Sequence, residues 1–89
     1  MSATSAAILG RVIEPDVPDW SADVARALLR LDFPPRDHAR VEELSAKASD
    51  GMLEAHEREE LEEYLRVSDM VAIIQSKARM ILQRSGATA

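Results

Sequence analysis

The sequence predicts an all-α protein, with a short N-terminal helical arm followed by three helices. The last helix is expected to be about 30 residues long and to form an antiparallel hairpin with the helix before it. Residues 54–84 contain neither glycine nor proline, the two residues that most often interrupt helices. Apolar residues recur at helical spacing in four segments separated by proline or glycine. A chain of 89 residues with 3% aromatic residues predicts one small domain with a largely aliphatic core.

The first segment places its apolar residues on one face of a short helix: Ile8, Leu9, Val12 and Ile13. This helix must end near Glu14, because Pro15 and Pro18 do not fit a helix interior. Residues 1–19 are therefore predicted to form a docked arm and a proline-containing linker.

Residues 20–85 are predicted to form a single helical domain, and Ser21 is a good N-cap for its first helix. The apolar stripe of that helix runs to roughly Leu31, where Phe33-Pro34-Pro35 turns the chain. Proline is favourable at a first helical position, so Pro35 can begin the next helix.

The following helix is predicted over residues 35–49, with Gly51 as the left-handed residue that ends it. The next loop is short, which favours an antiparallel hairpin with the final helix. That final helix, about residues 54–84, would be about 46 Å long. Gly86 should end it, and residues 86–89 should fray.

The final helix carries opposite charges at its two ends and has an unusual pattern of apolar residues. Its first part is acidic and its end is basic, which complements the helix dipole. The acidic residues are Glu54, Glu57, Glu59, Glu60, Glu62 and Glu63, and the basic residues are Lys77, Arg79 and Arg84. One apolar stripe includes Leu61, Tyr64, Leu65, Ser68, Val71, Ala72, Gln75, Ala78 and Leu82. Further apolar residues lie beside or outside it: Val67, Met70, Ile73 and Ile74. So small a chain cannot easily cover the middle of this helix, which indicates self-association or a protein partner.

Residues with catalytic or metal-binding potential are few. The chain has no cysteine, which excludes thiolate nucleophiles and cysteine zinc sites. His56 and Glu60 have the i, i+4 spacing of a zinc-protease helix, but that motif needs a second histidine and a third ligand. His38 beside Asp37 has no nucleophile in view and is better explained as a surface or capping residue. We therefore expect no enzyme activity, no metal and no cofactor.

The formal charge of −5 disfavours direct binding to nucleic acids or anionic membranes. A glutamate run such as that of residues 54–63 is typical of a solvated helix face, with a binding surface for a basic partner as the alternative. The longest apolar run, residues 70–74, is too short for a membrane span, and residues 1–13 lack the pattern of a signal peptide. These features predict a cytoplasmic protein.

The stretch from Ala25 to Leu82 resembles a family of short, uncharacterised bacterial helical proteins with the pattern LxFP…DHxR…GxL…EELExY…QSKAR. The matching residues are Leu31, Phe33, Pro34, Asp37, His38, Arg40, Leu44, Lys47, Gly51, Leu53, Glu60, Leu61, Tyr64, Gln75, Ser76, Lys77 and Arg79. In that family a Thr-Pro cap often begins the last helix, and here Glu54-Ala55 replace it, which implies a less sharply fixed start. Genes of this family often neighbour an HNH-type endonuclease gene, so the resemblance implies an accessory or antitoxin-like role.

Two hypotheses of function follow. The first is a non-enzymatic interaction module that buries the apolar middle of its last helix against a partner, such as a basic nuclease, with the glutamates steering association. The second is a structural homodimer without a nuclease partner. The predicted interaction residues are Leu61, Tyr64, Val67, Met70, Val71, Ile73, Ile74, Glu59, Glu60 and Glu63.

Overall fold

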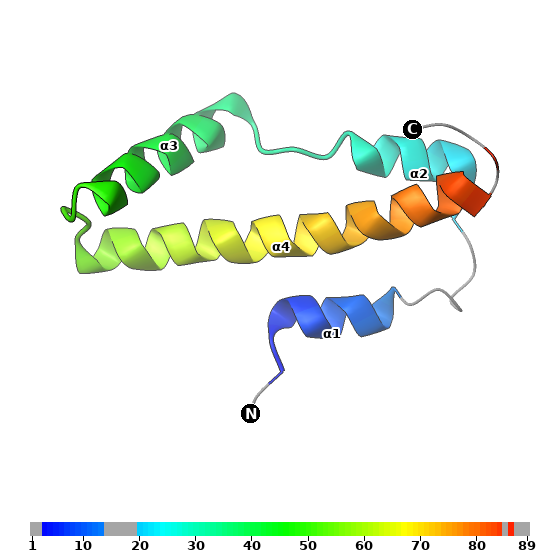
Figure 1. Ribbon diagram of the computed structural model, residues 1–89, viewed down its shortest axis with the longest axis horizontal. Coiled ribbons are helices and arrows are strands. Elements are labelled where there is room, and N and C mark those ends of the chain that lie inside the picture. Colours follow the sequence, from blue (N-terminus) through cyan, green and yellow to red (C-terminus); the bar gives the residue numbers. More distant parts are fainter. Residues whose placement is uncertain (1–2, 14–19, 85, 87–89) are drawn as a thin grey trace. The chain divides into compact units, whose positions relative to one another are not determined.

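The computed structural model describes residues 3–13, 20–84 and 86 of the chain. Within these residues it contains four α-helices and no strand: α1 Ser5–Val12, α2 Ala22–Leu29, α3 Pro35–Ser49 and α4 Ala55–Arg84 (Figure 1). The helix α4 packs against earlier helices, including α3. The predicted all-α class, with a long last helix that follows a hairpin turn, is confirmed.

The chain divides into two compact units, and α4 contributes to both. The hairpin unit comprises Asp32–Ser68, that is α3, its flanking loops and the first part of α4. The terminal unit comprises the described residues of Met1–Leu31 and Asp69–Ala89, that is α1, α2 and the remainder of α4.

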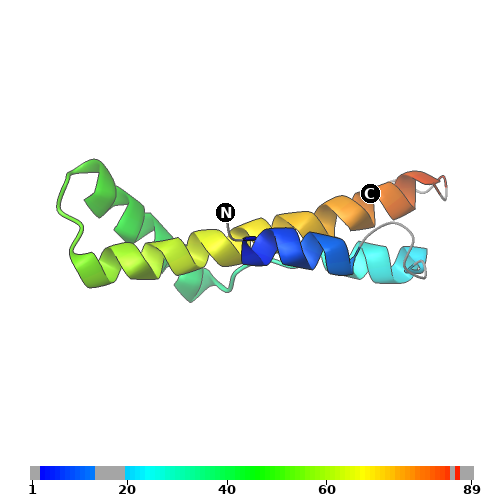
Figure 2. The ribbon, with the colours of Figure 1, turned by 90° about the horizontal axis from the view of Figure 1, so that it is seen from below.

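The hairpin unit is built on a sharply ended α3. Pro35 is the first residue of α3, as predicted, and Gly51 follows the helix with φ of 71°. The Gly51 N–H donates to the Ala48 carbonyl at 3.1 Å, and the Met52 N–H donates to the Lys47 carbonyl at 2.9 Å. This pair of bonds is the Schellman motif, which satisfies helix-end carbonyls and reverses the chain. It places α3 beside the first part of α4 (Figure 1, Figure 2), where Leu44 is fully buried.

A glutamate fixes the start of α4, which begins at Ala55. The Glu54 N–H donates to the Glu57 carboxylate at 3.1 Å, and the Glu54 carbonyl accepts from the Arg58 N–H at 2.9 Å. A glutamate that reaches back to an N–H three residues earlier is one half of a capping box. This contact fixes the start of α4, whereas the resemblance implied a less sharply fixed start.

The core of the terminal unit lies between α2 and the end of α4. Trp20, Leu28 and Leu29 pack against its buried apolar side chains. The buried side chains are those of Ala25, Ala78, Ile81 and Leu82. Ser21 caps α2 as predicted, because its hydroxyl accepts from the Val24 N–H at 3.2 Å. Lys77 is also buried, with its Nζ 5.6 Å from the centre of the Trp20 ring.

The helix α2 ends at Leu29, two residues before the predicted end at Leu31. The Gln75 side-chain amide of α4 donates to the Leu31 carbonyl at 2.9 Å and lies 3.3 Å from the carbonyls of Leu28 and Leu29. The Leu28 carbonyl also accepts from the Leu31 N–H at 3.1 Å, so Gln75 adds a second donor there and supplies a donor to the carbonyls of Leu29 and Leu31. The early end of α2 is thus stabilised by a contact distant in sequence.

The predicted arm forms α1, whose N-cap Thr4 accepts from the Ala7 N–H at 3.1 Å. It contains no buried residue, and Ile8 and Val12 of its apolar face are exposed. The predicted stop at Gly86 is confirmed by its φ of 76° and its bond to the Gln83 carbonyl at 3.2 Å. The predicted linker and the predicted fraying of the C-terminus fall on residues 14–19 and 87–89, which lie outside the described residues. None of the described helices has the length and apolarity that a membrane span requires.

Candidate interaction site on the hairpin unit

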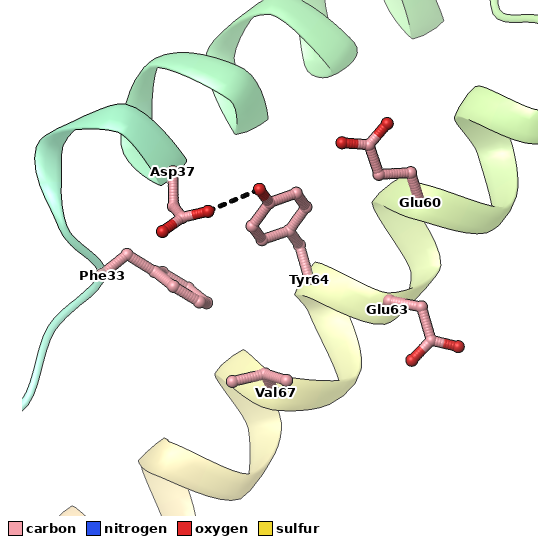
Figure 3. A pocket seen from close by; sticks show the side chains of 6 residues that line it. All are labelled: Phe33, Asp37, Glu60, Glu63, Tyr64 and Val67. Carbon is pink, nitrogen blue, oxygen red and sulfur yellow. Dashed lines mark hydrogen bonds between the residues drawn. The ribbon is translucent and has the colours of Figure 1, made fainter.

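An open cleft of about 330 Å³ lies within the hairpin unit (Figure 3). Its residues come from the turn before α3, the first turn of α3 and one face of α4: Phe33, Asp37, Glu60, Glu63, Tyr64 and Val67. Three of these side chains are carboxylates and three carry large apolar groups. The cleft therefore combines an apolar floor with negative charge.

Aromatic contacts form the floor of the cleft. The Phe33 ring packs edge-on against Tyr64, with 5.6 Å between ring centres and 77° between ring planes. His38 packs against Phe33 in a similar arrangement at 6.0 Å. Such edge-to-face geometry is favourable because the positive edge of one ring meets the negative face of another.

The Tyr64 hydroxyl holds the two sides of the cleft together. It donates a hydrogen bond to Oδ1 of Asp37 at 2.7 Å, as Figure 3 shows. The negative carboxylate stabilises the protonated phenol, so this bond raises the pKa of Tyr64 above its ordinary value. The bond joins α3 to α4 across 27 positions of sequence.

A bidentate ion pair lies beside the cleft. Arg40 of α3 donates from Nε to Glu60 at 2.9 Å and from Nη2 to the other Glu60 oxygen at 2.7 Å. The fork of the guanidinium matches the two oxygens of a carboxylate, which makes this a strong and directional contact. Arg40 also bonds Glu43. The pairing with Glu60 lowers the pKa of Glu60 and, together with Glu43, raises that of Arg40.

Glu57 is the most deeply buried charged group of the hairpin unit, at 4% exposure. Its carboxylate accepts from Lys47 Nζ at 2.5 Å and from the Glu54 N–H, and Arg40 Nη2 lies at 3.8 Å. The Lys47 bond is the main reason that the pKa of Glu57 is lowered, and the same bond raises the pKa of Lys47. The interpretation of the glutamate run as a solvated face is therefore wrong for Glu57, and Glu60 is half-buried in its pair with Arg40.

Four of the predicted interaction residues line the cleft: Glu60, Glu63, Tyr64 and Val67. Two others are also in the hairpin unit, Glu59 exposed and Leu61 half-buried. The remaining four are half-buried and belong to the terminal unit: Met70, Val71, Ile73 and Ile74. Sequence reasoning did not identify Phe33 and Asp37 as site residues, although their position at the turn into α3 was a signal that they would lie close to the hairpin.

The predicted apolar stripe of α4 differs from the observed one. Leu65, Ser68 and Ala72 are exposed, and Leu65 retains 55% of its accessible surface. Val67, which was predicted to lie outside or at the margin of the stripe, is 40% exposed. The hairpin unit therefore presents two large aliphatic side chains of α4 to solvent.

Neither histidine lines the cleft, although His38 packs against the lining residue Phe33. His38 Nε2 is 2.9 Å from Oδ1 of Asp32, and this contact lowers the pKa of Asp32. His56 is exposed, with Nδ1 3.4 Å from a Glu54 oxygen. Across residues 3–13, 20–84 and 86, no group of three or more histidine, aspartate or glutamate side chains is arranged to hold a metal ion.

Comparison of the chain with protein-family models, with curated proteins and with solved structures finds no significant match. Its functional interpretation therefore depends on the residues described above.

Proposed function

We propose that this chain is a non-enzymatic protein–protein interaction module that binds a basic protein, as an accessory or antitoxin-like partner of a bacterial HNH-type nuclease. The observation that carries the proposal is the exposure of Leu65 and Val67 on α4, in the same unit as a cleft that contains three carboxylates. Exposed apolar side chains with polar and charged groups around them are typical of a surface that another protein covers.

The charge of the chain supports a basic partner. The net charge is −5, and Glu59 and Glu63 of α4, two of the predicted interaction residues, are exposed. Opposite charge on the partner would accelerate association and select against acidic proteins, while apolar burial would provide most of the affinity.

The nuclease assignment draws on the sequence resemblance and on charge. A nuclease must present a basic surface to the phosphate backbone of its substrate. An acidic protein that covers such a surface would prevent DNA from binding. The proposed mechanism is thus competition for the basic groove, without any chemical step by the chain itself.

Co-expression with the protein encoded by the adjacent open reading frame tests the proposal. We expect the two proteins to co-purify and, where the neighbour is a nuclease, its DNA cleavage to be inhibited. The substitution Val67→Asp should abolish both effects, because it places a charge in the apolar contact, whereas Glu62→Gln should preserve them. Absence of a complex, together with unchanged nuclease activity, would refute the proposal.

Exposed apolar residues also favour a second candidate function, a homodimer formed through α4. Two-fold dimers are the commonest oligomers and need no other chain. Light scattering after size exclusion discriminates between a monomer and a homodimer. A mass of 9.8 kDa at high protein concentration excludes the homodimer. A mass of twice that value supports it.

A further inference from the structure

We propose that two copies of the chain pair with their α4 helices antiparallel, so that the hairpin unit of each copy contacts the terminal unit of the other. This inference rests on the second candidate function, the homodimer, and names its contacts. Leu65 of each copy packs against Met80 of the other copy. Glu62 of each copy pairs with Arg84 of the other copy. Because each copy carries both patches, a two-fold dimer makes each contact twice.

The hairpin unit contributes an apolar side chain beside an unpaired acid. Leu65 is one of the exposed large apolar side chains, and Glu62 lies three residues before it on the same side of α4. Glu62 is exposed and makes no ion pair with Arg58, one turn earlier, or with any other described residue. The negative charge of Glu62 is therefore available to a cation from another molecule.

The terminal unit contributes an apolar side chain beside an exposed base. Met80 is 41% exposed, and Arg84 lies four residues after it on the same side of α4. Arg84 is exposed, and no acid among the described residues lies within ion-pair distance of it. The same is true of Arg79, the residue before Met80. This patch therefore matches the patch of the hairpin unit with the opposite charge.

The order of the two patches along α4 fits an antiparallel pair. Glu62 precedes its apolar neighbour by about one turn of helix, whereas Arg84 follows its apolar neighbour by about one turn. Two helices that run in opposite directions can therefore make both contacts in one register. A parallel pair would instead place Glu62 beside Glu62 of the second copy, and this contact between like charges disfavours association. Ala72 and Ser76, which are small and exposed, lie between the patches and allow the two helices to approach closely.

Because these contacts are few and partly polar, the pairing should be weak. Stable interfaces bury roughly 1,200–2,000 Å² in total, which is more than two apolar contacts and two exposed ion pairs provide. We expect a dissociation constant on the order of 100 µM, with dimers at about 1 mM and monomers at about 10 µM. Leu65 should therefore stay exposed in the dilute chain.

Exchange of charge between two variants tests the pairing, with the mass measured by sedimentation equilibrium between about 10 µM and 1 mM. Glu62→Arg and Arg84→Glu each create like-charge contacts in both halves of the dimer, and each should weaken self-association by about tenfold. An equimolar mixture of the two variants should associate as well as the wild type, because every contact of the mixed dimer again joins a base to an acid. The control Glu42→Arg makes the same change at an exposed glutamate of α3 and should leave the association nearly unchanged.

Cysteine cross-linking tests the register, since the chain has no native cysteine. In the presence of oxidised glutathione, the double variant Leu65→Cys/Met80→Cys should form a disulfide-linked dimer. Leu65→Cys alone should not, because the antiparallel register separates the two copies of this position by about 22 Å.

Either of two results would overturn the inference. One is a wild-type mass of 9.8 kDa at about 1 mM, and the other is a mixture of the charge variants that associates no better than either variant alone. Circular dichroism of each variant checks that its helices are retained. The binding of a basic protein is judged separately: a monomeric chain that still binds the adjacent-frame protein refutes only the pairing, and a dimer that does not bind it refutes only the interaction module.

Discussion

Replacement of Leu44 by alanine should remove most of the stability of this protein. Leu44 is fully buried and, with Leu82, is one of the two largest side chains described at under 2% exposure. A leucine-to-alanine change at such a site loses transfer free energy and leaves a cavity, at a cost of about 3 kcal/mol. At about 0.05 kcal/mol per residue, a small domain of this length has only about 5 kcal/mol in total.

The matched control is Leu65→Ala, the same chemical change at a position with 55% exposure. An exposed substitution of this kind should cost about 0.5 kcal/mol or less. Urea unfolding followed by circular dichroism measures both variants. We expect Leu44→Ala to lower the midpoint by about 2 M, since small domains have slopes near 1–1.5 kcal/mol per M, and Leu65→Ala to leave the midpoint nearly unchanged.

Equal destabilisation by the two variants would refute the reasoning. It would mean that Leu65 is as well buried in solution as Leu44, and the argument from its exposure would fail. Urea unfolding repeated at several protein concentrations tests whether Leu65 is buried in a dimer. In that case the unfolding midpoint should rise with protein concentration.

Three further predictions concern single contacts. Gln75→Met, which keeps the size of the side chain but removes the donor to the carbonyls of Leu28, Leu29 and Leu31, should cost about 1 kcal/mol in thermal unfolding. An unchanged melting temperature would contradict a stabilising role for this contact. Tyr64 is the single tyrosine, so its absorbance titration is unambiguous. Its raised pKa predicts ionisation above pH 10.0 and a contribution to stability that is lost as the pH rises through the folded-state pKa. In Asp37→Asn the pKa of Tyr64 should return toward 10.0. Glu57 has a lowered pKa, so its contribution to stability is present above about pH 4.5 and is lost as the pH falls through the folded-state value. Between pH 7 and pH 3, Glu57→Gln should therefore lose less stability to urea than the wild type does. An equal loss in variant and wild type would contradict this role of Glu57.

Local signals predicted the helix ends that depend on neighbouring residues. Ser21 and Pro35 begin α2 and α3, and Gly51 and Gly86 follow α3 and α4, because capping and left-handed turns are properties of a few consecutive residues. The end of α2 at Leu29 could not be predicted in this way, since a donor to the carbonyls of Leu28 and Leu29 comes from Gln75 of α4.

The site was harder to predict than the helices. Glu57 and Glu59 both lie in one acidic run, yet the first is buried against Lys47 and the second is exposed. Their difference is set by the register of α3 against α4, which the sequence of α4 alone does not contain. For the same reason the sequence does not predict the contact between Asp37 and Tyr64, which the hairpin brings together.

Calorimetric titration of the purified adjacent-frame protein with the full chain tests the central claim most directly. We predict a saturable complex that weakens as salt is raised, is abolished by Val67→Asp and is retained by Glu62→Gln. A complex that Val67→Asp leaves intact, or no complex at low salt, would contradict the proposal that a basic protein covers the acidic and apolar face of α4.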